Sequence, residues 1–247
     1  MQFLENLIQS MSAHILPTAC IACQRFQHES ICTSCLNTLE NNSLIYYECC
    51  YQCGIPLQVQ ELPNKQCSYC KQCSPLFDET YCLDRYDGIL QTALHQLKYQ
   101  KRIAFVHGLA KAWNHIQSAQ LASADADYIL PVPLSPEKLL TRGFNQSWEI
   151  ARRIRLNMHT HKSPFILKRH HHSNHQAGSS MVTRQVAIRE MFYIDAQYNK
   201  SLQGKSVIIF DDVMTSGATL NEIARILKTI GVERVINWVL LRTTRFI

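Results

Sequence analysis

Short apolar runs, several of them rich in β-branched residues, recur along the second half of the chain. The clearest is residues 207–210, Val-Ile-Ile-Phe, whose uninterrupted apolar character is typical of a strand buried on both faces of a parallel sheet. By the same reasoning we predict strands at residues 127–134, 165–168, 191–194, 207–210 and 235–241. Residues 127–134 are expected to form the first strand of the core.

Between these runs, apolar residues recur at helical spacing. Ile89, Ala93, Leu94 and Leu97 fall on one face of a helix predicted over residues 89–99. Further helices are predicted at residues 103–117, 146–155 and 220–230. Strands that alternate with helices predict an α/β domain, with a mostly parallel sheet flanked by helices on both faces.

Residues 169–189 lack this periodicity and are polar and basic, with four histidines. We interpret them as a loop that could close over an anionic ligand and exclude water. The histidines are His170, His171, His172 and His175. Consecutive positions in a loop give poor ligand geometry, so solvated or phosphate-contacting histidines are favoured over a metal site.

An acidic pair and a hydroxyl-rich loop follow the strand at 207–210. Parallel strands in open sheets bind ligands at their carboxyl edge, where Asp211 and Asp212 are expected and could hold ribose hydroxyls. The loop precedes the helix at 220–230, whose first amides would face an anion. The alternative is a strand that ends at a well-capped helix and binds nothing. The candidate ligand-binding residues are Asp211, Asp212, Thr215, Ser216, Gly217, Ala218 and Thr219.

The cysteines are confined to the first third of the chain. Of 11 cysteines, the last is Cys82, and eight form four CxxC pairs. Two such pairs complete a tetrahedral four-sulfur site, so we predict one or two structural Zn²⁺ ions. Sequential and interleaved pairing are both open, and a redox pair is the alternative for any single CxxC. The candidate ligands are Cys20, Cys23, Cys32, Cys35, Cys50, Cys53, Cys67 and Cys70.

Composition narrows the class of protein. The chain has 247 residues, 46% hydrophobic and 18% charged, which fits a globular domain with a small appendage rather than a disordered protein. A formal net charge of +6 favours polyanionic partners. No apolar run approaches the roughly 20 residues that span a bilayer, and the N-terminus lacks a signal-peptide pattern, so we expect a cytoplasmic protein without membrane insertion.

Further motifs point to a family. The run at 207–219 resembles the phosphoribosyl pyrophosphate (PRPP) signature of type I phosphoribosyltransferases. Leu97-Lys-Tyr99, Pro131-Val-Pro-Leu134 followed by Arg142-Gly-Phe-Asn-Gln146, and Gln176 placed eight positions before Arg184 accompany it. With the four CxxC pairs, these motifs resemble the ComF family over nearly the whole chain.

The resemblance implies two domains and a ligand. Residues 1–75 would form a zinc-binding module with a short N-terminal helix, and residues 76–247 a type I phosphoribosyltransferase-like domain. PRPP would bind with Mg²⁺, with Arg142, Gly143 and Arg184 at its pyrophosphate. Ala187 stands where the family tends to have Asn, so the resemblance does not extend to that contact of the loop. Thr215 stands where purine-salvage enzymes often carry a carboxylate, so no general base is identifiable.

The family's association with natural competence implies a role in handling incoming single-stranded DNA, the function we expect first. Tyr99 or Phe144 could stack on bases. One alternative is an active PRPP-dependent phosphoribosyltransferase acting on an unidentified acceptor. Another is a scaffold that recruits a competence helicase through the zinc module. The candidate DNA-binding residues are Lys98, Lys101, Arg102, Arg152, Arg153 and Arg155, with Arg142 also available to a phosphate backbone.

Overall fold

A computed structural model describes residues 18–44, 47–117, 125–170 and 191–244 of the chain. Its main sheet has five strands, and every neighbouring pair in it is parallel. The mostly parallel α/β sheet expected from the sequence is therefore confirmed. In spatial order the strands are β3 (Glu79–Arg85), β9 (Arg234–Arg242), β8 (Ser206–Met214), β4 (Tyr128–Pro131) and β5 (His161–Lys162).

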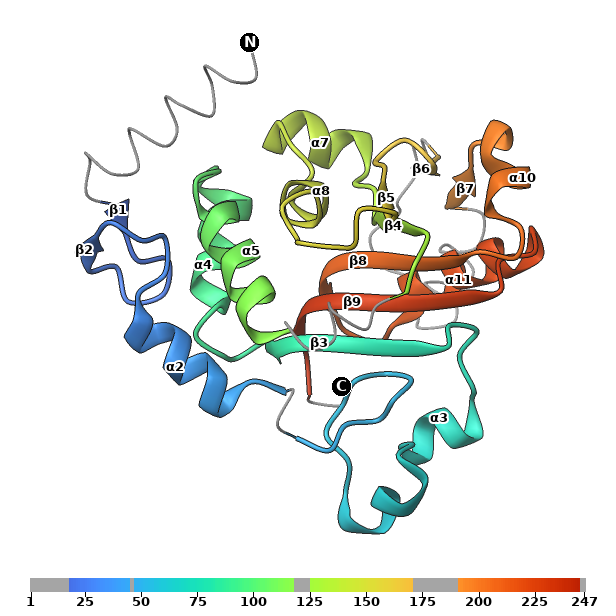
Figure 1. The fold of residues 1–247 in the computed structure, drawn as a ribbon, viewed down its shortest axis with the longest axis horizontal. Coiled ribbons are helices and arrows are strands. Elements are labelled where there is room, and N and C mark those ends of the chain that lie inside the picture. Colours follow the sequence, from blue (N-terminus) through green and yellow to red (C-terminus); the bar gives the residue numbers. More distant parts are fainter. Residues whose placement is uncertain (1–17, 45–46, 118–124, 171–190, 245–247) are drawn as a thin grey trace, which may run out of the picture.

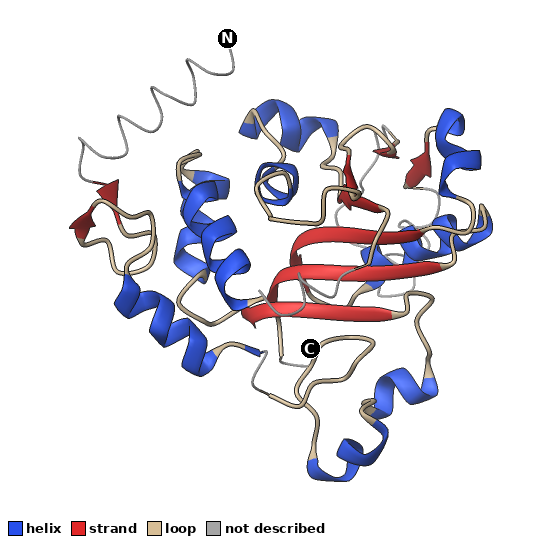
Figure 2. Ribbon diagram, viewed as in Figure 1, coloured by secondary structure: helices blue, strands red, loops and turns tan. Residues whose placement is uncertain are grey.

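Helices cover both faces of this sheet (Figure 2). One face packs against α4 (Gln91–Tyr99), α5 (Phe105–Ile116) and α8 (Gln146–Ala151), and the other packs against α11 (Ala218–Thr229). The central strands β8 and β9 are largely apolar because both of their faces are buried.

Side-chain alternation along β8 builds the two cores. Ile208 and Phe210 lie in the core beneath α5, whereas Val207 and Ile209 lie in the core beneath α11. Trp113 of α5 meets the ring of Phe210 at a centroid distance of 5.4 Å. Aromatic packing of this kind fixes α5 over the centre of the sheet.

Smaller elements surround the main sheet. Two antiparallel pairs lie outside it, one between β1 and β2 and one between β6 and β7. The remaining elements are β1 (Thr18–Ala19), β2 (Phe26–Gln27), α2 (Thr33–Asn42), η2 (Val59–Asn64), α3 (Ser68–Gln72), α7 (Pro136–Arg142), β6 (Leu167–Arg169), β7 (Phe192–Ile194), η3 (Ala196–Tyr198) and α10 (Asn199–Leu202).

Several predicted elements differ from the observed ones. The strands predicted at 165–168 and 191–194 pair with each other instead of joining the parallel sheet. The first strand of the core is β3 and not the strand at 127–134. Strand β3 was not predicted, because its sequence mixes polar and apolar residues. Helix α7 was not predicted.

The predicted helix over 146–155 is also too long, since α8 ends at Ala151. Strand β8 continues to Met214, so the acidic pair lies within the strand and not beyond its end. Pairing with β9 as far as Arg242 explains this extension, because backbone hydrogen bonds to a neighbour continue past the apolar run.

The two cysteine-rich segments lie against opposite faces of the sheet. Cys20 and Ile21 belong to the core beneath α5, and Ile21 fills the space left by Gly108, where an added Cβ would lie 2.8 Å from its Cδ1. Cys50 and Cys67 belong to the core beneath α11. Figure 1 shows the first segment beside α4 and α5 and the second below β3. The division at residue 75 stays a prediction.

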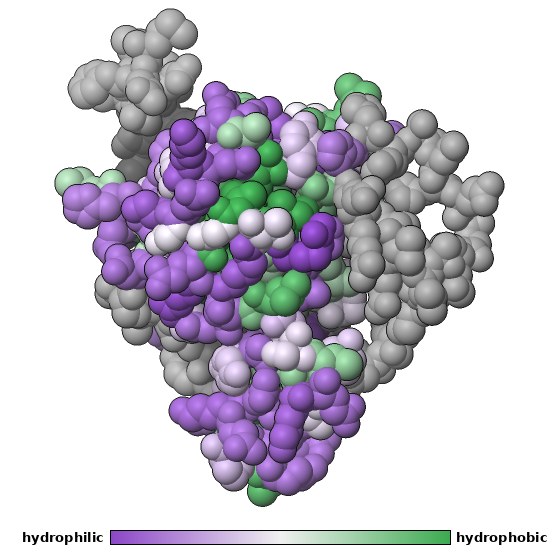
Figure 3. Space-filling view, turned by 90° about the vertical axis from the view of Figure 1, so that its right-hand side faces the viewer, coloured by the Kyte–Doolittle hydropathy of each residue, from purple (hydrophilic) through white to green (hydrophobic). Residues whose placement is uncertain are grey.

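The surface of the second segment differs from the face above it. Figure 3 shows apolar side chains gathered in the middle of one face, whereas the lower part, formed by the segment around η2 and α3, is mainly hydrophilic. Within the described residues, no helix is both long enough and apolar enough to cross a membrane.

Candidate functional site

The acidic pair lies near the carboxyl end of β8, in the middle of the parallel sheet. Successive residues of a strand point to opposite faces, so Asp211 and Asp212 diverge. Asp212 is 5% exposed and Asp211 is partly exposed. The amide of Asp212 donates to Asp211 Oδ1 at 2.9 Å. Burial, together with the neighbouring negative charge of Asp212, raises the pKa of Asp211 well above its usual range.

A lysine from α4 reaches this pair. Lys98 Nζ lies 2.8 Å from Asp212 Oδ2, and the two side chains are 17% and 7% exposed. The sequence interpretation placed Lys98 among residues that contact a DNA backbone, whereas the structure places its ammonium on the acidic pair. A partly buried pair of this kind holds the Asp212 carboxylate in one position.

The loop after β8 begins helix α11. Thr215 and Ser216 are exposed, and Gly217 is buried with a φ of 78°, a conformation that L side chains adopt only with strain. A Cβ on Gly217 would lie 2.6 Å from Met214 Cε. Two exposed hydroxyls therefore stand at the start of a helix whose first amides point outward.

A buried arginine at the end of β9 supports this loop from below. Arg242 is 5% exposed, and its Nη1 donates to Met214 O at 3.1 Å and to Thr215 O. The sequence interpretation missed this residue, although its signal was present: a cation directly follows the apolar run at 235–241.

The Arg142 motif lies beside the end of β4. Helix α7 ends at Arg142, and Gly143 has a φ of 86° that turns the chain toward α8. Asn145 Nδ2 donates to Val132 O at 3.0 Å, while Asn145 Oδ1 caps α8 by accepting from the amide of Ser147 at 3.0 Å. Because Val132 in turn donates to Phe210 O at 2.9 Å, the motif is fixed next to β8.

The guanidinium of Arg142 donates to Gln146 Oε1, which orients it within the motif. Arg184, predicted at the same pyrophosphate, lies outside the described residues, as does most of the predicted loop over 169–189. The acidic pair lies near the end of β8 and the hydroxyl loop follows this strand, while the Arg142 motif follows β4, the neighbour of β8 in the sheet.

The eight CxxC cysteines form two four-sulfur groups with sequential pairing, so interleaved pairing is wrong. In each group all Sγ atoms lie within 4.8 Å of one another. Cys23 and Cys32 Sγ are 3.8 Å apart, and Cys53 and Cys67 Sγ are 3.6 Å apart. Tetrahedral zinc with Zn–S near 2.3 Å sets sulfurs about 3.8 Å apart, so both groups fit this ion. The first tetrad is Cys20, Cys23, Cys32 and Cys35, and the second tetrad is Cys50, Cys53, Cys67 and Cys70.

Backbone amides prepare these sulfurs as thiolate ligands. The amide of Cys35 donates to Cys32 Sγ at 3.4 Å, and the amide of Cys70 donates to Cys67 Sγ at 3.4 Å. Although burial opposes it, such donation lowers the pKa of Cys20 to about 7. Cysteine is the only donor type in either tetrad, which is the donor set of a structural zinc site.

Comparison with known proteins agrees with this geometry. A model of the phosphoribosyl transferase domain matches residues 139–245, which include the Arg142 motif, the acidic pair and the hydroxyl loop. Competence protein F of Haemophilus influenzae is 27% identical over 231 residues, which cover 90% of this chain and 96% of that protein. Competence protein ComFC of Bacillus subtilis is 25% identical over 209 residues, 81% of this chain and 78% of that protein. The chain is therefore similar to the ComF proteins over most of its length.

A third relative of this chain carries a different name. DNA utilization protein YhgH of Escherichia coli K12 is 27% identical over 249 residues, which cover 92% of this chain and 98% of that protein. All three similarities cover more of the chain than the matched domain does.

Solved structures give weaker matches to this chain. The allosteric regulatory enzyme of purine biosynthesis has a TM-score of 0.33 at 19% identity and covers 53% of this chain and 24% of its own. Purine phosphoribosyltransferase from Pyrococcus horikoshii has a TM-score of 0.27 at 18% identity, over 60% of this chain and 84% of its own. Both TM-scores are low, so the fold is assigned from the sheet topology and the family model.

Some of the basic residues predicted to contact DNA form ion pairs within the protein. Arg152 and Arg153 both pair with Glu149 Oε2, each at 2.7 Å. Helices α5 and α8 pack together, since Asn114 Nδ2 of α5 donates to Arg153 O at 3.1 Å. Burial and the positive charge of both arginines lower the pKa of His107 on α5. Arg155, after α8, is exposed, as are Lys101 and Arg102 before α5.

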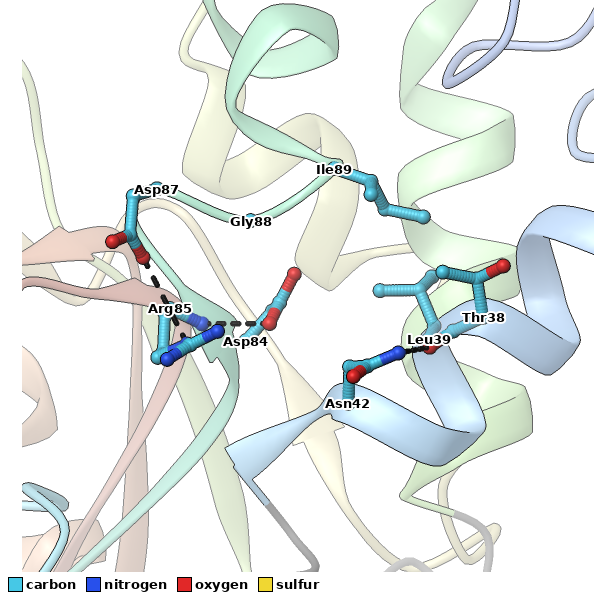
Figure 4. A pocket seen from close by; sticks show the side chains of 8 residues that line it. All are labelled: Thr38, Leu39, Asn42, Asp84, Arg85, Asp87, Gly88 and Ile89. Carbon is cyan, nitrogen blue, oxygen red and sulfur yellow. Dashed lines mark hydrogen bonds and ion pairs between the residues drawn. The ribbon is translucent and has the colours of Figure 1, made fainter.

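A cavity of about 300 Å³ opens between α2 and the turn after β3 (Figure 4). Asp84 lies at its wall, 3% exposed, and accepts from the amide of Arg85 at 2.8 Å. Burial raises the pKa of Asp84 to about 6. Thr38 and Asn42 of α2 face it across the cavity, so the first cysteine-rich segment forms one wall.

Proposed function

We propose that this protein binds PRPP with Mg²⁺ at the carboxyl edge of its parallel sheet and acts on incoming single-stranded DNA during natural competence. The observation that carries the proposal is the succession of acidic pair, hydroxyl loop and helix start along β8 and α11, with the Arg142 motif after the neighbouring strand β4. Phosphate-binding sites in open α/β folds have this location.

Each part of the site has a chemical role toward PRPP. The carboxylates of Asp211 and Asp212 would accept hydrogen bonds from ribose hydroxyls. Thr215 and Ser216, with the amides that follow, would receive the 5′-phosphate at the start of α11. Arg142 would present its planar guanidinium to the pyrophosphate.

Mg²⁺ would enter with the pyrophosphate and neutralise part of its charge. Carboxylate oxygens of the kind present at Asp211 and Asp212 suit this hard cation. In the absence of a ligand, Lys98 supplies positive charge at Asp212. The ammonium and the incoming ligand would therefore share one carboxylate.

We propose binding of PRPP and not its turnover, because the loop at 215–219 contains no group that could transfer a proton. Thr215 offers a hydroxyl, which does not accept a proton at neutral pH, so an acceptor that must lose a proton would find no base there. Glycosyl transfer to an unidentified acceptor is the alternative function, supported by the match to the phosphoribosyl transferase domain.

The two cysteine tetrads would each hold one structural Zn²⁺ ion. All four sulfurs of the second tetrad lie in buried residues, so a bound ion would have no open position for a substrate. Bound zinc would supply folding free energy to segments with few large apolar side chains.

The competence role is taken from the relatives, whose names are Competence protein F, Competence protein ComFC and DNA utilization protein. The cations at the end of α8 support it, because the exposed Arg152 and Arg155 could follow a phosphate backbone. Recruitment of a competence helicase through the cysteine-rich segments is a further alternative.

Calorimetric titration of the zinc-loaded protein with PRPP and Mg²⁺ tests the proposal. Replacing Asp211 and Asp212 together by Ala is expected to abolish binding. The matched control replaces Asp125 and Glu233 by Ala, two exposed carboxylates that precede β4 and β9 at the opposite edge of the sheet. Absence of binding by the wild-type protein, or full affinity in the Asp211/Asp212 variant, would overturn the proposal.

Repeating the titration with a short single-stranded oligonucleotide present separates the two parts of the function. Binding of the oligonucleotide without any binding of PRPP would mean that the fold serves DNA handling alone.

A further inference from the structure

Arg242 joins the second tetrad to the hydroxyl loop. Its Nε donates to the carbonyl of Cys53, a residue of that tetrad, at 2.8 Å. Its Nη1 donates to the carbonyls of Met214 and Thr215, which open the loop. One rigid guanidinium plane thus contacts a predicted zinc ligand and the predicted phosphate loop, which are about 160 residues apart in the chain.

This guanidinium is buried, yet its contacts are to oxygens without formal charge. It is 5% exposed, and none of the ion pairs among the described residues involves Arg242. A buried cation without an anionic partner is unfavourable. Four thiolates around a divalent ion carry two net negative charges, so a metal-loaded second tetrad would provide the compensating charge.

A second contact runs beside the first. The segment between the second tetrad and β3 lies along the start of α11, where the amide of Leu76 donates to Asn221 Oδ1 at 2.7 Å. Phe77, 3% exposed, packs with its Cζ 3.8 Å from the Cβ position of Gly217. The second cysteine-rich segment therefore touches the loop region at two independent points.

We infer that Arg242 is a positioning residue that couples metal occupancy of the second tetrad to the shape of the loop at 215–219, and so to affinity for PRPP. The inference rests on the proposed function and deepens it. The first tetrad lies on the other face of the sheet, against α5, and is not coupled.

Coupling between two sites is reciprocal. If zinc at the second tetrad raises the affinity for PRPP, then PRPP raises the affinity of that tetrad for zinc by the same factor. This equality gives two separate measurements, and neither depends on catalytic turnover.

The first test compares matched cysteine variants. Cys70→Ser and Cys35→Ser each remove the last ligand of one tetrad, and each is expected to lower bound zinc to one ion per chain. Only Cys70→Ser should weaken PRPP binding in calorimetry, by roughly tenfold. Equal PRPP affinity in the two variants would overturn the inference.

The second test changes the arginine itself. Arg242→Lys keeps the charge but loses the planar fork that contacts Cys53 and the loop together, so PRPP binding should weaken by roughly tenfold with zinc retained. The control is Arg234→Lys at the other end of β9, where Arg234 pairs with Glu79. Arg242 is buried and its variant could fail to fold. Asn221→Ala, at a partly exposed position near the start of α11, removes the Leu76 contact alone and should weaken PRPP binding in the same direction.

The reciprocal test follows zinc release to a chromophoric chelator from the Cys35→Ser protein, whose zinc is in the second tetrad. PRPP should slow this release, and it should not slow it once Arg242→Lys is added. Release that is indifferent to PRPP, in a protein that binds PRPP, would overturn the inference and leave the proposed function intact. A wild-type protein that binds no PRPP would overturn both.

Discussion

Asp84 shows what burial does to a single carboxyl group in this protein. Its side chain lies beneath the turn after β3, where a Cβ on Gly88 would come within 2.1 Å of its Oδ2. The pKa is raised to about 6, because burial disfavours the charged form. In the unfolded chain the group would titrate near 3.9. The favourable contribution of protonated Asp84 to the free energy of unfolding is therefore fully present below about pH 4, and it is lost as the pH rises through about 6.

Asp84→Asn is expected to stabilise the protein at about pH 8, by up to about 3 kcal/mol, because it removes the charge and keeps an oxygen for the Arg85 amide. Near pH 4 the two proteins should have similar stability. Urea unfolding across this pH range measures the difference. Asp87→Asn, at a more exposed neighbour, is the control. A difference that does not vary with pH would show that the charge of Asp84 is not its cause.

Individual site residues were predictable where chemistry and sequence position coincide. Asp211 and Asp212 directly follow the apolar run at 207–210 and Thr215 directly follows β8, so their common location needs no distant contact. The roles of Arg242, Lys98 and Asp84 depend on partners elsewhere in the chain and on burial. Lys98 meets Asp212 across more than a hundred residues, and no local pattern encodes that distance.

Among the loops, the one that begins α11 is defined by a single glycine. Gly217→Ala would place a side chain at a φ of 78° and within 2.6 Å of Met214 Cε. The strained backbone should cost about 1–2 kcal/mol of stability, and the displaced Met214 should also weaken PRPP binding. Urea unfolding and PRPP titration measure the two effects.

Gly204 offers a control for that substitution. Its φ is 67°, and nothing lies within 4 Å of an added Cβ. Gly204→Ala should therefore lower stability to a similar extent and leave PRPP binding unchanged. If both variants bind PRPP as the wild type does, the shape of the loop does not govern affinity.

Elements with strong periodicity were predicted well, and those with mixed patterns were not. Strand β9 and helix α11 are apolar or amphipathic over their whole length and differ from prediction by a residue or two. Strand β3 reads Glu-Thr-Tyr-Cys-Leu-Asp-Arg, and its place at the sheet edge tolerates polar residues. The fourfold repeat of CxxC predicted both tetrads, but only the fold decides their pairing.

Across the chain as a whole, positive charge exceeds negative charge by six. We predict that single-stranded oligonucleotides bind with little sequence preference and that affinity falls with added salt, because counterions are released. Reversing Arg152, Arg153 and Arg155 to Glu should weaken binding and reduce the salt dependence. Fluorescence anisotropy at several salt concentrations measures both.

The control reverses three exposed cations elsewhere, Arg25, Lys71 and Lys200, and so changes the net charge equally. Equal losses in the two triple variants would indicate attraction to net charge rather than to the surface formed by α5 and α8. Unchanged affinity after reversal at 152, 153 and 155 would exclude that surface.

The strand order has a consequence for synthesis on the ribosome. Thr80 of β3 lies beside Asn237 of β9, 157 residues later, and their side chains are hydrogen-bonded. At a synthesis rate of roughly 5–20 residues per second, β9 is made on the order of 10–30 s after β3. All cysteines have been synthesised by then, so the two tetrads could bind the proposed Zn²⁺ before the sheet forms. A transcript truncated before β9 would yield metal-loaded chains that aggregate or are degraded, with β3 left unpaired.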